Sequence, residues 1–101
     1  MDKHDVFVEE LCMTLDNKYE FFEKHVVLFK SCRAKRRRVV AEVDLIAYKD
    51  NYCDVYEVKC SHRITKARMQ LKKIRKYVCN VKKTFFYCGE SKQIIPIKTK
   101  H

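Results

Sequence analysis

Apolar and polar residues alternate along two short stretches in the middle of the chain, residues 42–47 and 54–59. Alternation with a period of two is typical of β-strands, in which side chains two residues apart lie on the same face. The polar tripeptide between the stretches, residues 49–51, contains residue types that favour tight turns. The pattern therefore predicts a β-hairpin in which charged side chains from both strands share one face.

Two other stretches follow the helical period of 3.6 residues. Apolar residues recur at this spacing over residues 5–15, which predicts an amphipathic helix. A second apolar stripe runs from Ile64 through Leu71 to Val78, with lysine and arginine residues around it. This stripe predicts a second helix over residues 64–79 with a basic outer surface.

Further strands are predicted at residues 25–29, 84–88 and 94–97, and Pro96 indicates that the last strand lies at a sheet edge. The predicted order is α-β-β-β-α-β-β. A three-strand meander, a crossover helix and further strands make a mixed central sheet with flanking helices, which is an α/β (α+β) fold. A length of 101 residues fits a single domain, residues 1–101.

The chain is strongly basic, with 23 Lys and Arg residues against 13 Asp and Glu residues and a formal net charge of +10. This charge favours a polyanionic partner, and nucleic acid fits better than a membrane because no long apolar run or lipidation signal occurs. Without a signal peptide, we expect an intracellular protein, cytoplasmic or, in a eukaryotic host, nuclear and associated with DNA. Six cysteines without a CxxC pair are expected to be free, buried thiols.

A basic run, SCRAKRRR at residues 31–38, immediately precedes the first hairpin strand. Such runs are often solvated surface. At this place, however, the run is well positioned to bind the phosphates of a nucleic acid. Side chains of the second helix are candidates of the same kind, with a solubilising role as the alternative. The predicted nucleic-acid contacts are Arg33, Lys35, Arg36, Arg37, Arg38, Lys66 and Arg68.

Asp44 on the first hairpin strand and Glu57-Val58-Lys59 on the second resemble the core motif of the PD-(D/E)xK nucleases. More narrowly, the phrase VDLIAY…DVYEVK is similar to archaeal Holliday junction resolvases and small restriction-endonuclease-like proteins. The resemblance covers roughly residues 5–88 and implies a restriction-endonuclease-like core. The alternative is an exposed sheet face with a salt bridge. Here the acidic residues interrupt an apolar pattern, and buried charges are costly unless they are paired or bind a metal.

The resemblance implies a metal-dependent DNA endonuclease, with Holliday junctions or flaps as candidate substrates. Asp44 and Glu57 would be direct ligands of Mg²⁺, for which Mn²⁺ can substitute, and the backbone carbonyl of Val58 would add a third oxygen. Lys59 would position or activate the attacking water. A helix glutamate joins the metal site in this family, and either Glu10 or Glu9 fits that place, unless both are ordinary exposed charges.

Two alternative functions remain, a non-catalytic nucleic-acid-binding protein on the same fold and an RNA-directed nuclease. The complete set of Asp44, Glu57 and Lys59 favours a nuclease, because a pure binding protein does not need buried carboxylates that repel phosphate. The related resolvases act as homodimers, which implies a homodimer here too. The expected interface is either the second helix or the strands of residues 84–97, which are rich in aromatic side chains.

Overall fold

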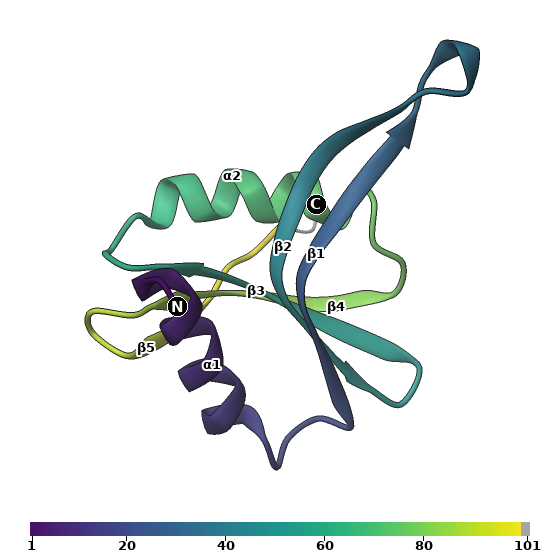
Figure 1. The fold of residues 1–101 in the computed structure, drawn as a ribbon. Helices are drawn as coiled ribbons and strands as arrows, with labels where there is room; N and C mark the ends of the chain where they lie inside the picture. Colours follow the sequence, from purple (N-terminus) through teal and green to yellow (C-terminus); the bar gives the residue numbers. More distant parts are fainter. Residues whose placement is uncertain (100–101) are drawn as a thin grey trace.

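The computed structural model describes residues 1–99 and has two helices and a five-stranded sheet (Figure 1). The predicted order of elements is confirmed. In chain order they are α1 (Lys3–Leu15), β1 (Phe21–Ser31), β2 (Arg37–Lys49), β3 (Tyr52–Lys59), α2 (Ile64–Arg75), β4 (Val81–Cys88) and β5 (Gln93–Pro96).

The strands lie in the order β1-β2-β3-β4-β5. Each neighbouring pair is antiparallel except β3 and β4, which run parallel. Parallel neighbours need a crossover connection, and α2 supplies it. The sheet is therefore mixed, as predicted, and the two helices cover its opposite faces (Figure 1).

Each helix packs on its own apolar cluster. On one face α1 packs against side chains of β2, β3 and β4, and this cluster contains Phe7, Val8, Leu11, Leu15, Leu45, Ala47, Tyr56, Val58 and Tyr87. On the other face α2 packs against a cluster that contains Val43, Ile46, Cys53, Val55, Ala67, Leu71, Ile74, Phe86, Cys88 and Ile97. The strands therefore have few solvated positions in their central parts.

Of the three aromatic residues of β4, two are buried inside the protein and one is half-buried. Phe86 is buried against α2, whereas Phe85 and Tyr87 belong to the cluster under α1. The ring of Phe85 also stacks on that of Tyr56 at 4.7 Å between centroids. A homodimer stays a prediction, and Phe85 is the residue of this aromatic group that keeps exposed surface.

Some boundaries differ from the predicted ones. The second helix ends at Arg75 instead of residue 79. The next two backbone N–H groups donate 3₁₀-type hydrogen bonds to the carbonyls three residues earlier, those of Lys73 and Ile74. Asn80 then takes a left-handed conformation with φ 59° and leads into β4. The first two strands are longer than predicted because they stay paired with each other beyond the part of the sheet that the helices cover.

The outer ends of β1 and β2 form a two-stranded arm, residues 29–39, that projects from the body (Figure 1). Every residue of the arm is exposed. Its strands stay paired as far as Ser31 and Arg37, and the guanidinium of Arg37 lies 4.7 Å from the ring centroid of Phe29. At the tip, Ala34 and Lys35 adopt left-handed conformations with φ 62° and 59°.

All six cysteines are unpaired in the structure. Cys53 and Cys88 are buried as predicted, whereas Cys32 and Cys79 are exposed, so the prediction of buried thiols is wrong for these two. Within residues 1–99, neither helix has the length and apolar character that a bilayer span requires.

The single glycine of the chain, Gly89, is buried directly beneath the ring of Phe7. A Cβ atom at this position would lie 2.1 Å from Cδ2 of Phe7, so the substitution Gly89→Ala requires the Phe7 ring or the helix that carries it to shift. We expect a loss of about 1–3 kcal/mol in the free energy of unfolding, measured by urea denaturation. The double variant Gly89→Ala/Phe7→Leu should lose less than the sum of its single changes. Additive losses would show that this contact is not the cause.

Candidate active site

The strands β2 and β3 separate at Asp44. Backbone pairing between them ends at Leu45 and Tyr56. Beyond that pair, Oδ2 of Asp44 accepts a hydrogen bond of 2.8 Å from the backbone N–H of Val58. The carboxylate thus takes the place of a ladder bond, which holds it beside the end of β3 that carries Glu57.

The neighbouring strand is irregular at the same level. The β1–β2 register omits the His25–Asp44 position, and His25 has a left-handed backbone with φ 53°. A positive φ is uncommon outside glycine, and residues in such conformations concentrate at functional sites. At this level of β2, Val43 packs in the cluster under α2, although strict alternation predicts that it shares the face of Leu45.

Glu57 and Lys59 lie on the face of β3 that α2 covers. Cys53 and Val55, which precede them at two-residue spacing, belong to the apolar cluster under α2. Glu57 is only 2% exposed, and its Oε1 atom has no hydrogen-bond partner among the described residues. Its Oε2 atom lies 3.5 Å from Nζ of Lys59, which is 18% exposed.

The environment of Glu57 favours its protonated form in the absence of a metal. Burial is the main cause and raises the pKa of Glu57 to about 9. The nearby carboxylate of Asp44 raises the pKa further, and the ammonium group of Lys59 opposes the shift. A buried carboxyl with an unused oxygen is costly, and strongly perturbed pKa values concentrate at functional sites.

The first turn of α1 completes this cluster. Nε2 of His4 lies 3.0 Å from the backbone oxygen of Val58 and 3.4 Å from Oδ1 of Asp44. Its other ring nitrogen, Nδ1, lies 3.7 Å from Oδ1 of Asp5, which in turn is 3.6 Å from Nε2 of His25. A histidine and an aspartate from the helix therefore lie next to the two acidic residues of the hairpin.

The start of α1 also holds a second group of ligand-type residues. Asp2 caps the helix, since its Oδ1 accepts a bond of 2.9 Å from the backbone N–H of Asp5. Asp2, His4 and Asp5 have ligand atoms within 4.8 Å of one another. His4 thus belongs to this exposed group as well as to the cluster around Asp44.

The helix glutamates expected at the centre point elsewhere. Glu10 pairs with Nζ of Lys92, and Glu9 pairs with Nζ of Lys24 at 2.6 Å. Both are surface ion pairs. The structure therefore brings Asp44, Glu57, Val58 and Lys59 together as predicted, but the helix contributes His4 in place of a glutamate.

Each predicted nucleic-acid contact is exposed. The five arginine and lysine residues of the basic run lie at the tip of the arm, and Lys66 and Arg68 lie at the beginning of α2. The arm tip projects away from that end of α2 (Figure 1). The two groups would therefore contact different parts of a nucleic acid.

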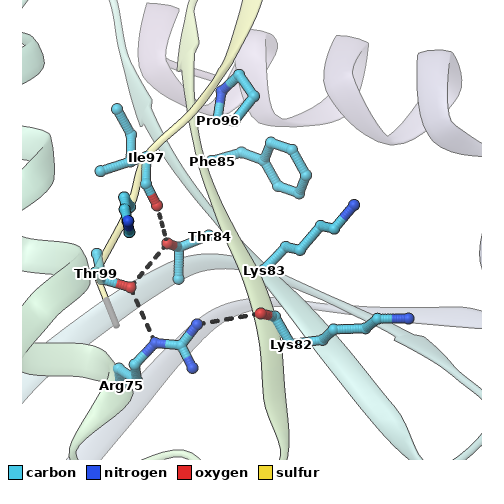
Figure 2. A pocket seen from close by; sticks show the side chains of 9 residues that line it. Arg75, Lys82, Lys83, Thr84, Phe85, Pro96, Ile97 and Thr99 are labelled. Atoms are coloured by element: carbon cyan, nitrogen blue, oxygen red, sulfur yellow. Dashed lines mark hydrogen bonds between the residues drawn. The ribbon is translucent and has the colours of Figure 1, made fainter. Parts of the chain in front are cut away.

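A basic cavity of about 360 Å³ lies between the end of α2, the start of β4 and the segment after β5 (Figure 2). Arg75 donates a hydrogen bond of 2.9 Å to Oγ1 of Thr99 and another of 2.8 Å to the backbone oxygen of Val81. Thr99 also bonds to Thr84 at 3.0 Å. This network ties the final described residues to the sheet, and none of the candidate centre's side chains lines the cavity.

No protein-family model matches the chain, and no curated protein is significantly similar to it. The functional interpretation therefore depends on the geometry around Asp44 and Glu57.

Proposed function

We propose that the protein is a metal-dependent endonuclease that hydrolyses phosphodiester bonds in DNA and has a restriction-endonuclease-like core. The observation that supports this function best is the buried Glu57, with one oxygen unused, beside Asp44 and Lys59. Two acidic groups in one small, buried space repel each other. Such an arrangement is stable with both groups ionised only when a cation lies between them.

The residues fit a small divalent cation. Asp44, Glu57 and the backbone oxygen of Val58 supply oxygen ligands, which suit Mg²⁺ and Mn²⁺. When bound, such a cation would polarise the phosphate and lower the pKa of a bound water. The unused oxygen of Glu57 is the group that gains most, because the cation would offset the cost of its burial.

The side chains have separable roles in this proposal. Asp44 is held in place by the N–H of Val58, which prevents it from turning toward solvent. Lys59 lies between the buried Glu57 and the surface, where its ammonium group would position a water and offset charge that develops on the phosphate. The exposed arm would bind the DNA backbone without reading its sequence.

A panel of labelled substrates tests the function directly. It contains duplex DNA, single-stranded DNA, a flap, a four-way junction and RNA, each with Mg²⁺, Mn²⁺ or a chelator. We expect cleavage of at least one DNA substrate that depends on the metal. Binding without cleavage under every condition would support a non-catalytic protein, and cleavage of RNA alone would support an RNA-directed nuclease.

The arm is expected to supply affinity for any DNA sequence. Replacing Lys35, Arg36, Arg37 and Arg38 together with alanine should weaken binding and flatten its salt dependence. Each lost phosphate contact should lower the log–log slope by about 0.9. Fluorescence anisotropy on a labelled duplex between low and moderate salt measures both quantities.

The matched control for the arm removes the same charge from exposed lysines of the body, Lys18, Lys49, Lys82 and Lys83. This control should change the slope less than the arm variant does. Equal slopes for the two variants would mean that the basic run at the tip is a solvated surface.

A further inference from the structure

His4 reaches the candidate centre from a different layer of the fold than Asp44 and Val58. Its Nε2 atom lies 3.0 Å from the oxygen of Val58 and 3.4 Å from Oδ1 of Asp44. Two ligand atoms at right angles around a small divalent cation, each about 2.1 Å from it, are about 3.0 Å apart. Both separations from Nε2, the first of which is a hydrogen bond in this structure, therefore suit neighbouring ligands of one cation.

The other nitrogen of His4 has a partner that suits a metal-binding histidine. Such histidines commonly donate their second ring N–H to a carboxylate, which fixes the tautomer and leaves the first nitrogen free for the metal. Nδ1 of His4 lies 3.7 Å from Oδ1 of Asp5. This separation is longer than a hydrogen bond, so Asp5 and the ring would have to approach each other when a metal binds Nε2.

Asp5 is itself held near this position. It is part of the first turn of α1, where its N–H binds the capping Asp2, and its carboxylate faces Nε2 of His25 at 3.6 Å. His25 lies in the strand irregularity next to Asp44. The polar groups of α1, β1 and β2 thus converge on the imidazole of His4.

We infer that His4 is a direct ligand of the metal in the proposed nuclease and makes the centre prefer Mn²⁺ to Mg²⁺. This inference rests on the proposed function. A glutamate in the helix would complete a set of oxygen ligands that suits Mg²⁺. An imidazole instead favours the transition metals, and among them Mn²⁺ best tolerates the remaining oxygen ligands. The change from a helix glutamate to His4 therefore changes the expected metal.

Calorimetric titration with Mn²⁺ and with Mg²⁺ compares the parent with His4→Ala and His4→Gln. We expect His4→Ala to lose about tenfold or more in Mn²⁺ affinity, with a smaller change for Mg²⁺. His4→Gln offers an oxygen in place of the nitrogen and should narrow the preference for Mn²⁺. Asp5→Asn should weaken Mn²⁺ binding by about tenfold through the orientation of the ring. Met13→Ala, at an exposed position of the same helix, is the control and should change neither affinity.

Pulsed electron paramagnetic resonance of the Mn²⁺-loaded protein provides a second readout. Coupling of the ion to an imidazole nitrogen should be present in the parent and absent in His4→Ala. Thermal unfolding followed by circular dichroism verifies that each variant is folded.

The outcomes separate this inference from the proposed function. Nitrogen coupling that persists in His4→Ala, or an unchanged ratio of the two affinities, overturns the role of His4 and leaves the nuclease proposal intact. Nitrogen coupling that persists in Asp44→Asn places the ion at the exposed group of Asp2, His4 and Asp5, and also overturns the inference. A parent protein that binds neither ion and cuts no substrate overturns the proposed function itself.

Discussion

Replacing Asp44, Glu57 or Lys59 singly with alanine is expected to reduce metal-dependent cleavage on the order of 10³-fold or more, while DNA binding stays largely intact. The reason is the division of roles in the proposed function, in which these side chains would serve the chemical step and the basic arm would supply most of the affinity. Single-turnover cleavage and anisotropy on the same substrate measure the two effects separately.

Residues of one catalytic unit depend on one another, so removing one of them already removes most of the rate enhancement. A double variant of Asp44 and Glu57 should therefore cleave only slightly more slowly than either single variant. Asp54→Asn is a matched control on β3. Asp54 is also buried, but its oxygens are already used by the hydroxyl of Tyr19 and the N–H of Lys83. The control should keep its cleavage rate per folded molecule. If Lys59→Ala cuts as fast as the parent, the assignment of the site is wrong.

The metal-free protein is expected to become less stable as the pH rises from about 5 to about 9, and Glu57 is the cause. The pKa of Glu57 is about 9 in the folded protein, against an ordinary value of 4.5. Between these values the folded state keeps a proton that the unfolded state releases. A rise in pH therefore favours unfolding, and the stability from protonated Glu57 is fully present only below the unfolded pKa.

Glu57→Gln replaces the protonated acid by a neutral group of the same shape. In the presence of a chelator, we expect the variant to match the parent near pH 5 and to exceed its free energy of unfolding by on the order of 1–3 kcal/mol at pH 8. Urea denaturation at several pH values measures this difference. Added Mn²⁺ should stabilise the parent at pH 8 and the variant much less. Parallel pH profiles of parent and variant would show that Glu57 is ionised in the folded protein.

The hairpin part of the site was predictable from the sequence because its pattern is local. The period of two places Glu57 and Lys59 on one face whatever the rest of the fold does, and the turn at residues 49–51 brings Asp44 near them. The helical part was not predictable in this way. The spacing of apolar residues in α1 shows which side of the helix is buried, but it does not show how far the helix is shifted along the sheet. That shift decides whether His4 or Glu10 meets Asp44.

The strand irregularity escaped prediction for a related reason. A left-handed residue at His25 leaves no mark in the hydrophobic pattern, and its ring lies near carboxylates that are distant in sequence, Asp5 of α1 and Glu42 of β2. For the helical part of the site, the only local signals in the sequence were two ligand-type residues, His4 and Asp5, which precede the apolar stripe of the helix. They indicate ligand-type chemistry only once the helix is placed on the sheet.

The projecting arm has a consequence for how this protein can change over evolutionary time. Side chains at the tip, residues 30–38, are exposed and meet chiefly their partners across the same two strands. Substitutions there have little influence on the folding free energy, which comes from the clusters under the helices. The arm can therefore change in sequence with little effect on folding, whereas under the proposed function changes at Asp44, Glu57 and the residues that hold them would be selected against.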